Sequence, residues 1–151
     1  MNKVGMLVLL ALVIGTLAGC SNGINVIKPT ETTSTIGIIQ FEDCNTGQYT
    51  DCKDSGKKVS EVYSTVLGAP IIPREDSGKF DAILTGDVLE YNIATPMLFR
   101  PNMVVVSLKL KDKTGTLLAT QVKGEKENNL TGSAEGCNKT LAAALKKELN
   151  R

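Results

Sequence analysis

The chain of 151 residues contains no histidine and no tryptophan. Without histidine it cannot build a Ser-His-Asp or Cys-His catalytic site, and it lacks the most common general base and metal ligand. We therefore expect a protein that is not an enzyme and that holds no metal ion and no dissociable cofactor.

The sequence also has no apolar run long enough to cross a membrane. Its most apolar segment, residues 6–17, follows Lys3 and leads into small residues, which is the order of a signal peptide. A transmembrane helix needs about 20 apolar residues. We expect residues 1–19 to be a cleaved lipoprotein signal peptide.

The end of this segment reads Leu17-Ala18-Gly19-Cys20 and resembles the lipobox of bacterial lipoproteins at all four positions. The resemblance implies that the Cys20 thiol carries a diacylglycerol and its amino group an acyl chain, a covalent anchor that needs more than one chain to be stable. In lipoproteins of the enterobacterial kind, Ser21 after the cysteine points to the outer membrane. We expect a lipid-anchored protein on the periplasmic face of that membrane.

No excess of charge of either sign remains after processing. The mature chain has 132 residues with 16 basic and 16 acidic side chains. Nucleic acids and anionic lipid surfaces are bound through excess positive charge. We expect no nucleic-acid partner and a membrane contact made through the lipid alone.

The mature chain divides into a polar start and one folded domain. Residues 20–35 comprise Cys20 and a stretch rich in Thr and Ser, which predicts a flexible tether. Residues 36–151 are long enough for one domain with its own core.

Within the domain, the spacing of apolar residues predicts two helices and several strands. Apolar positions three and four residues apart indicate helices over 54–68, with Asp54 or Ser55 as the cap, and over 133–149. Short apolar or alternating stretches indicate strands at 36–41, 80–91, 103–111 and 116–123, the last two joined by a turn at 112–115. Residues 71–72, between two prolines, fit only an edge strand.

This order of elements predicts the fold class. We expect an α/β protein, more closely an α+β two-layer sandwich, in which a mixed, mostly antiparallel sheet carries two helices on one face.

Several of these segments resemble a known group of domains. The stretches IGIIQFED, FDAILTGDVLEYN and VVVSLKLKDKTGTLLAT, each placed between or beside the helices, are similar to the small CsgG-like or TolB-N-terminal-like domains of periplasmic lipoproteins, including the PelC and YajG types. The resemblance implies a non-enzymatic part of an envelope machine, in a group where several members form rings. The segments between strands are too short for the membrane hairpins of CsgG itself, so a secretion pore made by this chain alone is not expected.

Three cysteines remain beside Cys20. Cys44 and Cys52 flank one polar loop, and an oxidising compartment would favour a disulfide between them. Cys137 lies on the apolar stripe of the last helix and is interpreted as a small buried hydrophobe. A metal site is the weaker alternative, because histidine is absent and the spacing does not fit.

The connection at 95–103 is unusually apolar for a loop between strands. It contains the candidate contact residues Met97, Leu98, Phe99, Arg100 and Met103. Exposed apolar groups around an arginine are typical of a protein contact. The alternative is that the loop folds over the open end of the sandwich and completes the core.

Three functional hypotheses follow. The first is an accessory or assembly lipoprotein that binds an envelope protein, or a second copy of itself, through this loop or a sheet edge. The second is a binding module for a small molecule or cell-wall glycan, which would need an aromatic pocket although the chain has three Phe and three Tyr. The third is an enzyme that uses a pair of the carboxylates near strand ends, which are Glu42, Asp43, Asp81, Asp87 and Glu90.

Overall fold

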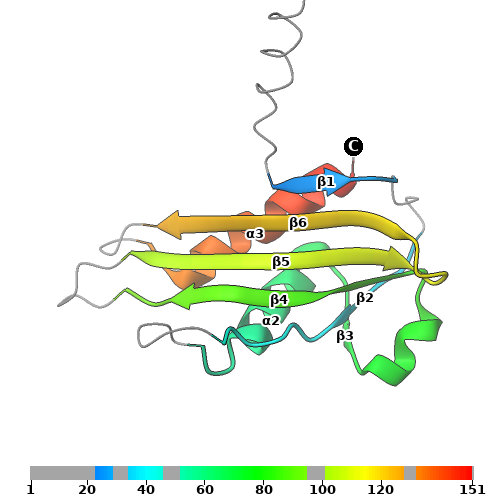
Figure 1. Cartoon of the computed structure of the whole chain (residues 1–151), viewed down its shortest axis with the longest axis horizontal. Helices are drawn as coiled ribbons and strands as arrows, with labels where there is room; N and C mark the ends of the chain where they lie inside the picture. The colour runs from blue at the N-terminus through cyan, green and yellow to red at the C-terminus, as the bar shows by residue number, and fades with distance from the viewer. Residues whose placement is uncertain (1–22, 29–33, 46–51, 95–100, 128–131, 151) are drawn as a thin grey trace, which may run out of the picture.

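Among the residues described by the computed structural model of this chain, a sheet of six strands carries two α-helices on one of its faces (Figure 1). The structure describes residues 23–28, 34–45, 52–94, 101–127 and 132–150. The predicted fold class, an α+β sandwich with both helices on one face of a mixed sheet, is confirmed.

The strand order in the sheet is β1-β6-β5-β4-β2-β3. Strand β2 runs parallel to its neighbours β3 and β4, and the other neighbouring strands are antiparallel. The bounds are β1 Ile24–Val26, β2 Ile36–Ile39, β3 Ile71–Ile72, β4 Ala82–Asn92, β5 Asn102–Asp112 and β6 Leu117–Glu127.

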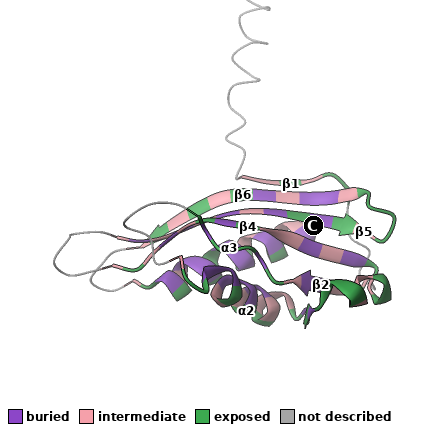
Figure 2. Ribbon diagram, turned by 60° about the horizontal axis from the view of Figure 1, so that its bottom comes forward, coloured by how far each residue is buried: buried purple, intermediate pink, exposed green. Residues whose placement is uncertain are grey.

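The core lies between the sheet and the helices α2 (Ser55–Leu67) and α3 (Ala134–Leu149), as Figure 2 shows. The alternation predicted for β5 is present, because Val104, Val106, Leu108 and Leu110 are all buried against the helices. Cys137 and Leu141 of α3 are fully buried opposite them. Apolar residues that recur every two positions on the strands and every 3.6 positions on the helices thus form one core layer between the sheet and the helices.

Helix α2 begins differently from the prediction. Asp54 occupies the N-cap position in a left-handed conformation, but its side chain makes no capping bond. The cap comes from Asp43 instead, whose Oδ1 accepts the Gly56 backbone N–H at 2.7 Å. A carboxylate near a helix N-terminus is favoured by the helix dipole.

Helix α3 is capped at its N-terminus from both its own sequence and the sheet. Ser133 Oγ accepts the N–H of Gly136 at 2.9 Å, and Oε2 of Glu127, at the end of β6, accepts the N–H of Ser133 at 2.7 Å. At the other end of the helix, Lys146 donates to the Val66 carbonyl of α2. These bonds fix the position of α3 against both β6 and α2.

The expected tether is wrong in part. Residues 24–26 form edge strand β1, paired with Ala119 to Gln121 of β6, and Ile24 and Val26 pack against the core. The two apolar side chains are buried on the inward face, and the free edge of β6 supplies backbone hydrogen bonds. Together these contacts order a segment whose composition is otherwise polar. The domain therefore begins before Ile36.

A short 3-10 helix, η1 (Arg74–Lys79), joins β3 to β4 and was not predicted. No helix among the described residues is both long and apolar enough to cross a membrane.

Candidate interaction site

The loop between β2 and α2 is closed by a disulfide between Cys44 and Cys52, which confirms the predicted pair. The Cys44 backbone N–H donates to the Ser55 hydroxyl at 3.1 Å, and Cys44 itself is buried. The bridge therefore holds the chain beside Asp43, the residue that caps α2.

Cys137 is the free cysteine of the described region, and it is fully buried. Burial raises the pKa of its thiol, and Glu127 adds to the effect by repelling the thiolate. A buried thiol of this kind is unreactive. Within the described ranges, no group of three or more His, Cys, Asp or Glu side chains is placed to hold a metal ion.

Most of the residues expected to contact a partner lie outside the residues that the structure describes. Cys20 and the loop residues Met97, Leu98, Phe99 and Arg100 lie outside the described residues, so the lipid anchor and the loop contact stay predictions. Met103 is different, because it belongs to strand β5 and is paired with Lys126 of β6. Met103 also begins the strand predicted at 103–111, which is confirmed, and its assignment to the loop contact is wrong because β5 starts at Asn102.

Met103 is half-buried and points to the sheet face opposite the helices. Val105 follows on the same face of β5, and Val122 of β6 lies diagonally across from it with 57% of its surface exposed. In Figure 2 helices α2 and α3 both lie on the other side of the sheet, whereas η1 lies beside the outward residues Ile39, Ile83 and Thr85 on the β2 side of this face. We call Met103, Val105 and Val122, together with Leu89, the open-face patch.

Leu89 joins the patch through a β-bulge in β4. The register between β4 and β5 shifts between Val88 and Glu90, and both Val88 and Tyr91 are buried. The extra residue in the bulge leaves Leu89 and Glu90 together on the outer face, where Leu89 is 43% exposed. Two neighbouring strands thus present apolar side chains beside Val105.

Charges of opposite sign flank the open-face patch. Asp87 and Glu90 lie on β4, on one side of the patch. Lys126 lies on β6, on the other side, and Lys109 lies on β5, toward one end of the patch. An apolar centre with a charged rim is the general arrangement of protein interfaces.

The sheet edges are less suited to a partner strand. Strand β3 has two residues between Pro70 and Pro73, and proline cannot donate to a neighbouring strand. On the opposite edge, β1 covers only Ala119 to Gln121 of β6, and the uncovered part reads KGEKE over 123–127. Short, proline-flanked or charged edges resist strand addition. The predicted edge contact is therefore less favoured than a contact through the open face.

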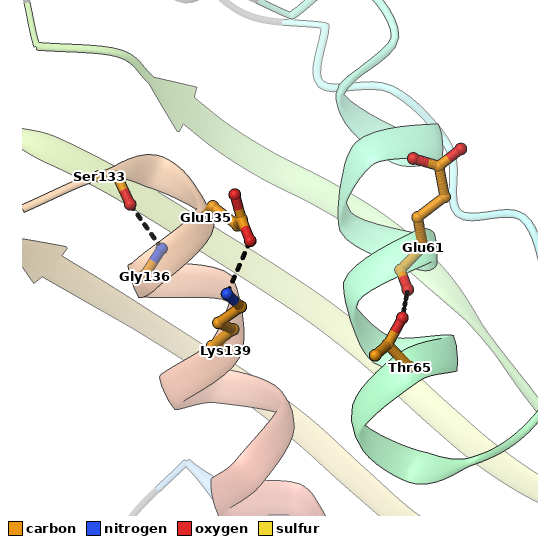
Figure 3. Close-up of polar contacts among 6 residues, drawn as sticks. All are labelled: Glu61, Thr65, Ser133, Glu135, Gly136 and Lys139. Atoms are coloured by element: carbon orange, nitrogen blue, oxygen red, sulfur yellow. Dashed lines mark hydrogen bonds and ion pairs between the residues drawn. The ribbon is translucent and has the colours of Figure 1, made fainter.

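A groove of about 440 Å³ lies between the two helices on the opposite layer. Figure 3 shows Glu135 and Lys139 on the side of α3 that faces α2, joined by an ion pair of 2.7 Å. The lining comes from both helices and β4: Lys58, Glu61, Val62, Thr65, Val66, Tyr91, Glu135, Asn138 and Lys139.

Asn138 of α3 is the unusual residue of this groove. It is 1% exposed, yet its Oδ1 is buried without a hydrogen-bond partner. Sequence reasoning did not single it out, although the signal was present, because Asn138 lies four residues after Ala134 and three before Leu141 on the apolar stripe of α3. A polar residue at a core position needs an explanation.

Two of the candidate carboxylates, Asp43 and Asp81, make hydrogen bonds that hold the fold. Asp43 caps α2, and Asp81 accepts hydrogen bonds from the Thr35 backbone and hydroxyl at 2.9 Å each. These two bonds hold the pKa of Asp81 below its ordinary value. Neither carboxylate faces the groove between the helices.

Comparisons with known proteins identify the fold. No protein-family model matches the chain, and no curated protein matches its sequence. Among solved structures, the PelC dodecamer from Paraburkholderia phytofirmans is 16% identical with a TM-score of 0.65, covering 83% of this chain and 95% of that one. A substituted form of the same dodecamer gives 18% identity and a TM-score of 0.66, covering 83% and 96%. The chain thus shares the fold of PelC, and the predicted resemblance to this type is confirmed at that level.

Proposed function

We propose that this chain is a lipid-anchored component of a cell-envelope machine that acts without catalysis, through protein contacts made by the open-face patch. The observation that carries the proposal is the outer face of the sheet, which neither α2 nor α3 covers and where Leu89, Met103, Val105 and Val122 form an apolar centre between acidic and basic rims. A contact of this kind buries apolar surface that a monomer leaves in water.

A second copy of the chain is the partner that we favour. PelC, which has the same fold, assembles as a dodecamer. The flanking charges of the patch are opposite in sign, so a second copy can place its acidic side near the basic side of the first. When the two open-face patches pack together, the acidic side of each copy would then attract the basic side of the other.

The position of β1 sets how close the domain lies to the proposed anchor. Four positions separate Cys20 from Ile24, the first residue of the edge strand. Extended chain spans at most about 3.5 Å per residue, so β1 would lie within roughly 14 Å of the lipidated cysteine. The sheet would be held at the membrane surface, on the outer membrane as the sequence predicts. The Cys44–Cys52 disulfide supports an oxidising compartment such as the periplasm.

A glycan-binding function has less support. Sugar recognition would need an aromatic platform, but the aromatic residue of the helix groove, Tyr91, is 5% exposed. Its ring also lies beneath the Lys58 ammonium, which is 5.5 Å from the ring centroid. No face of this ring is open for stacking at the groove.

The proposal is tested by light scattering on the mature chain with Cys20→Ser, at several concentrations. We expect an oligomer whose mass falls to that of a monomer in Val122→Lys. Ile27→Lys is the matched control, because Ile27 is 54% exposed and lies outside the patch. An oligomer of the same mass in the Val122 variant, with a folded circular-dichroism spectrum, would overturn the open face as its interface.

A further inference from the structure

The open-face patch is built around strand β5, which lies between β4 and β6 in the sheet. Val105 of β5 is paired with Glu90 on one side and with Gly124 on the other. Neighbouring strands are about 4.8 Å apart, so residues of β4 and β6 lie at equal distances from β5. What β4 presents on this face therefore has a counterpart on β6, at the same distance from the centre of the patch.

Opposite charges stand on these two flanking strands, Glu90 on β4 and Lys126 on β6. The two strands are about 9.6 Å apart, and among the described residues neither side chain has an ion pair within its own chain. Asn92 Nδ2 donates to Oε1 of Glu90 at 2.7 Å, which orients the carboxylate before any partner arrives. A carboxylate that is already oriented loses little freedom when it pairs with a cation of another molecule.

The patch also projects on the β4 side and is low on the β6 side. The β-bulge presents Leu89 on the outer face, where 43% of its surface is exposed. Across β5, Gly124 has no side chain, and a Cβ there would meet Cγ2 of Val105 at 3.1 Å. A projecting leucine and a bare glycine are complementary in shape when they belong to two different copies.

Given that a second copy is the partner under the proposed function, we propose that two copies pack open face against open face about a two-fold axis that runs along β5. This axis exchanges the β4 side of one copy with the β6 side of the other, as in any contact between identical surfaces. Leu89 of each copy then lies on the partner's Gly124. Glu90 of each copy meets the partner's Lys126, so the contact contains two equivalent ion pairs.

A two-fold axis across the strands is the other way to pack the two faces. It would place β4 of one copy against β4 of the other, so the acidic residues Asp87 and Glu90 of the two copies would repel each other. With the axis along β5, Met103 and Val105 meet the same residues of the partner on the axis, and each acidic side faces a basic side. Charge and shape thus favour the same arrangement.

Charge exchange tests the pairing, by light scattering on the mature chain with Cys20→Ser. Glu90→Lys alone and Lys126→Glu alone each place like charges together twice per contact, and each should raise its dissociation constant about tenfold or more. The double variant should regain the parent affinity. An equimolar mixture of the two single variants should also regain it, because each copy then offers the charge that the other needs. High salt should reduce these differences.

Two further variants serve as control and as an independent test. Lys109→Glu makes the same charge change on the same face, but Lys109 lies on β5 itself and is not exchanged with Glu90. It should therefore not restore association to Glu90→Lys. Gly124→Leu fills the position under the partner's Leu89 and should abolish association while the circular-dichroism spectrum stays folded. If Gly124→Leu does not fold, the charge exchange alone decides.

The two-fold arrangement is overturned if either single variant associates like the parent, or if the double variant and the mixture both stay dissociated although folded. In that case, an oligomer of the parent that Val122→Lys still dissociates would keep the open face as the interface and exclude only this arrangement. A parent chain that stays a monomer at every concentration would overturn the second copy as the partner, and the two-fold arrangement with it.

Discussion

The Tyr63 hydroxyl donates a hydrogen bond of 2.8 Å to Oε1 of Gln121, and both side chains are fully buried. Gln121 in turn donates from Nε2 to the Leu141 carbonyl at 2.9 Å. Two side chains thus connect α2, the sheet strand β6 and α3 through the centre of the core. A fully paired polar network of this kind fixes how the two helices sit on the sheet.

The two partners of this network should not contribute to stability independently. Tyr63→Phe leaves the Gln121 oxygen buried without a donor, and we expect a loss of roughly 1–3 kcal/mol in the free energy of unfolding. Urea denaturation measures this loss. Gln121→Leu is the companion variant, and the double variant should be less destabilised than the sum of the two single ones. Additive losses would show that the bond contributes nothing.

The same tyrosine predicts how stability depends on alkaline pH. Burial raises the pKa of Tyr63 well above its ordinary value of 10.0, and this outweighs the opposite effect of the bond to Gln121. Below pH 10 the hydroxyl is protonated in both folded and unfolded chains, so its contribution to stability is fully present. Above pH 10 the unfolded chain loses the proton first, and stability falls by about 1.4 kcal/mol per pH unit. Tyr63→Phe should show a shallower decline in unfolding experiments between pH 9 and 12, and an equal slope would contradict the burial of this hydroxyl.

Gly56 is predicted to be irreplaceable despite lying in the first turn of a helix. A Cβ added there would meet the Phe41 carbonyl oxygen at 2.0 Å, a contact with backbone that no side-chain movement relieves. We expect Gly56→Ala to destabilise the domain by about 3 kcal/mol, although alanine is ordinarily the better helix former. Gly78→Ala is the control, because a Cβ there meets nothing within 4 Å. Equal melting temperatures for the two variants would contradict this packing.

The disulfide should stabilise the domain through the short loop that it closes. Cys44 and Cys52 are eight positions apart. For a loop of this length the chain-entropy model gives about 2.5 kcal/mol. The double variant with alanine at both positions should lose about this amount in chemical denaturation under oxidising conditions. If reduction of the parent protein leaves its stability unchanged, the loop is ordered by other contacts.

Local patterns predicted the elements whose partners are close in sequence. The stripes of α2 and α3, the alternation of β5 and the turn at 112–115 all depend on neighbouring residues, and each is confirmed. Strand β1 was missed because three residues give almost no periodic signal. Its partner strand, β6, also lies about 95 positions further along the chain. The cap of α2 was misassigned for a related reason. The capping residue Asp43 precedes the loop before the helix, whereas the prediction considered only residues directly at the start of the helix.

The candidate sites were less predictable than the fold. The composition of 95–103 drew attention to a loop, whereas Met103 lies on a strand and acquires its neighbours Leu89 and Val122 only through sheet pairing and a bulge. The groove depends on two helices that are far apart in the chain, and Asn138 becomes unusual only when its amide oxygen is seen without a partner. Both surfaces follow from tertiary contacts that the sequence pattern does not contain.

The central claim is that the open-face patch is covered in the cell envelope, and cysteine labelling measures this directly. Val122→Cys and Ile27→Cys place thiols at side chains of nearly equal exposure, 57% and 54%, while Cys137 is buried and unreactive. Cells whose outer membrane has been made permeable and the dissociated purified protein are treated with the same maleimide, which does not cross the inner membrane. We predict that the thiol at 122 is protected in cells and labelled in the dissociated protein, while the thiol at 27 is labelled in both. Equal labelling of the two thiols in cells would contradict the account, because the face would then be exposed where it is proposed to act.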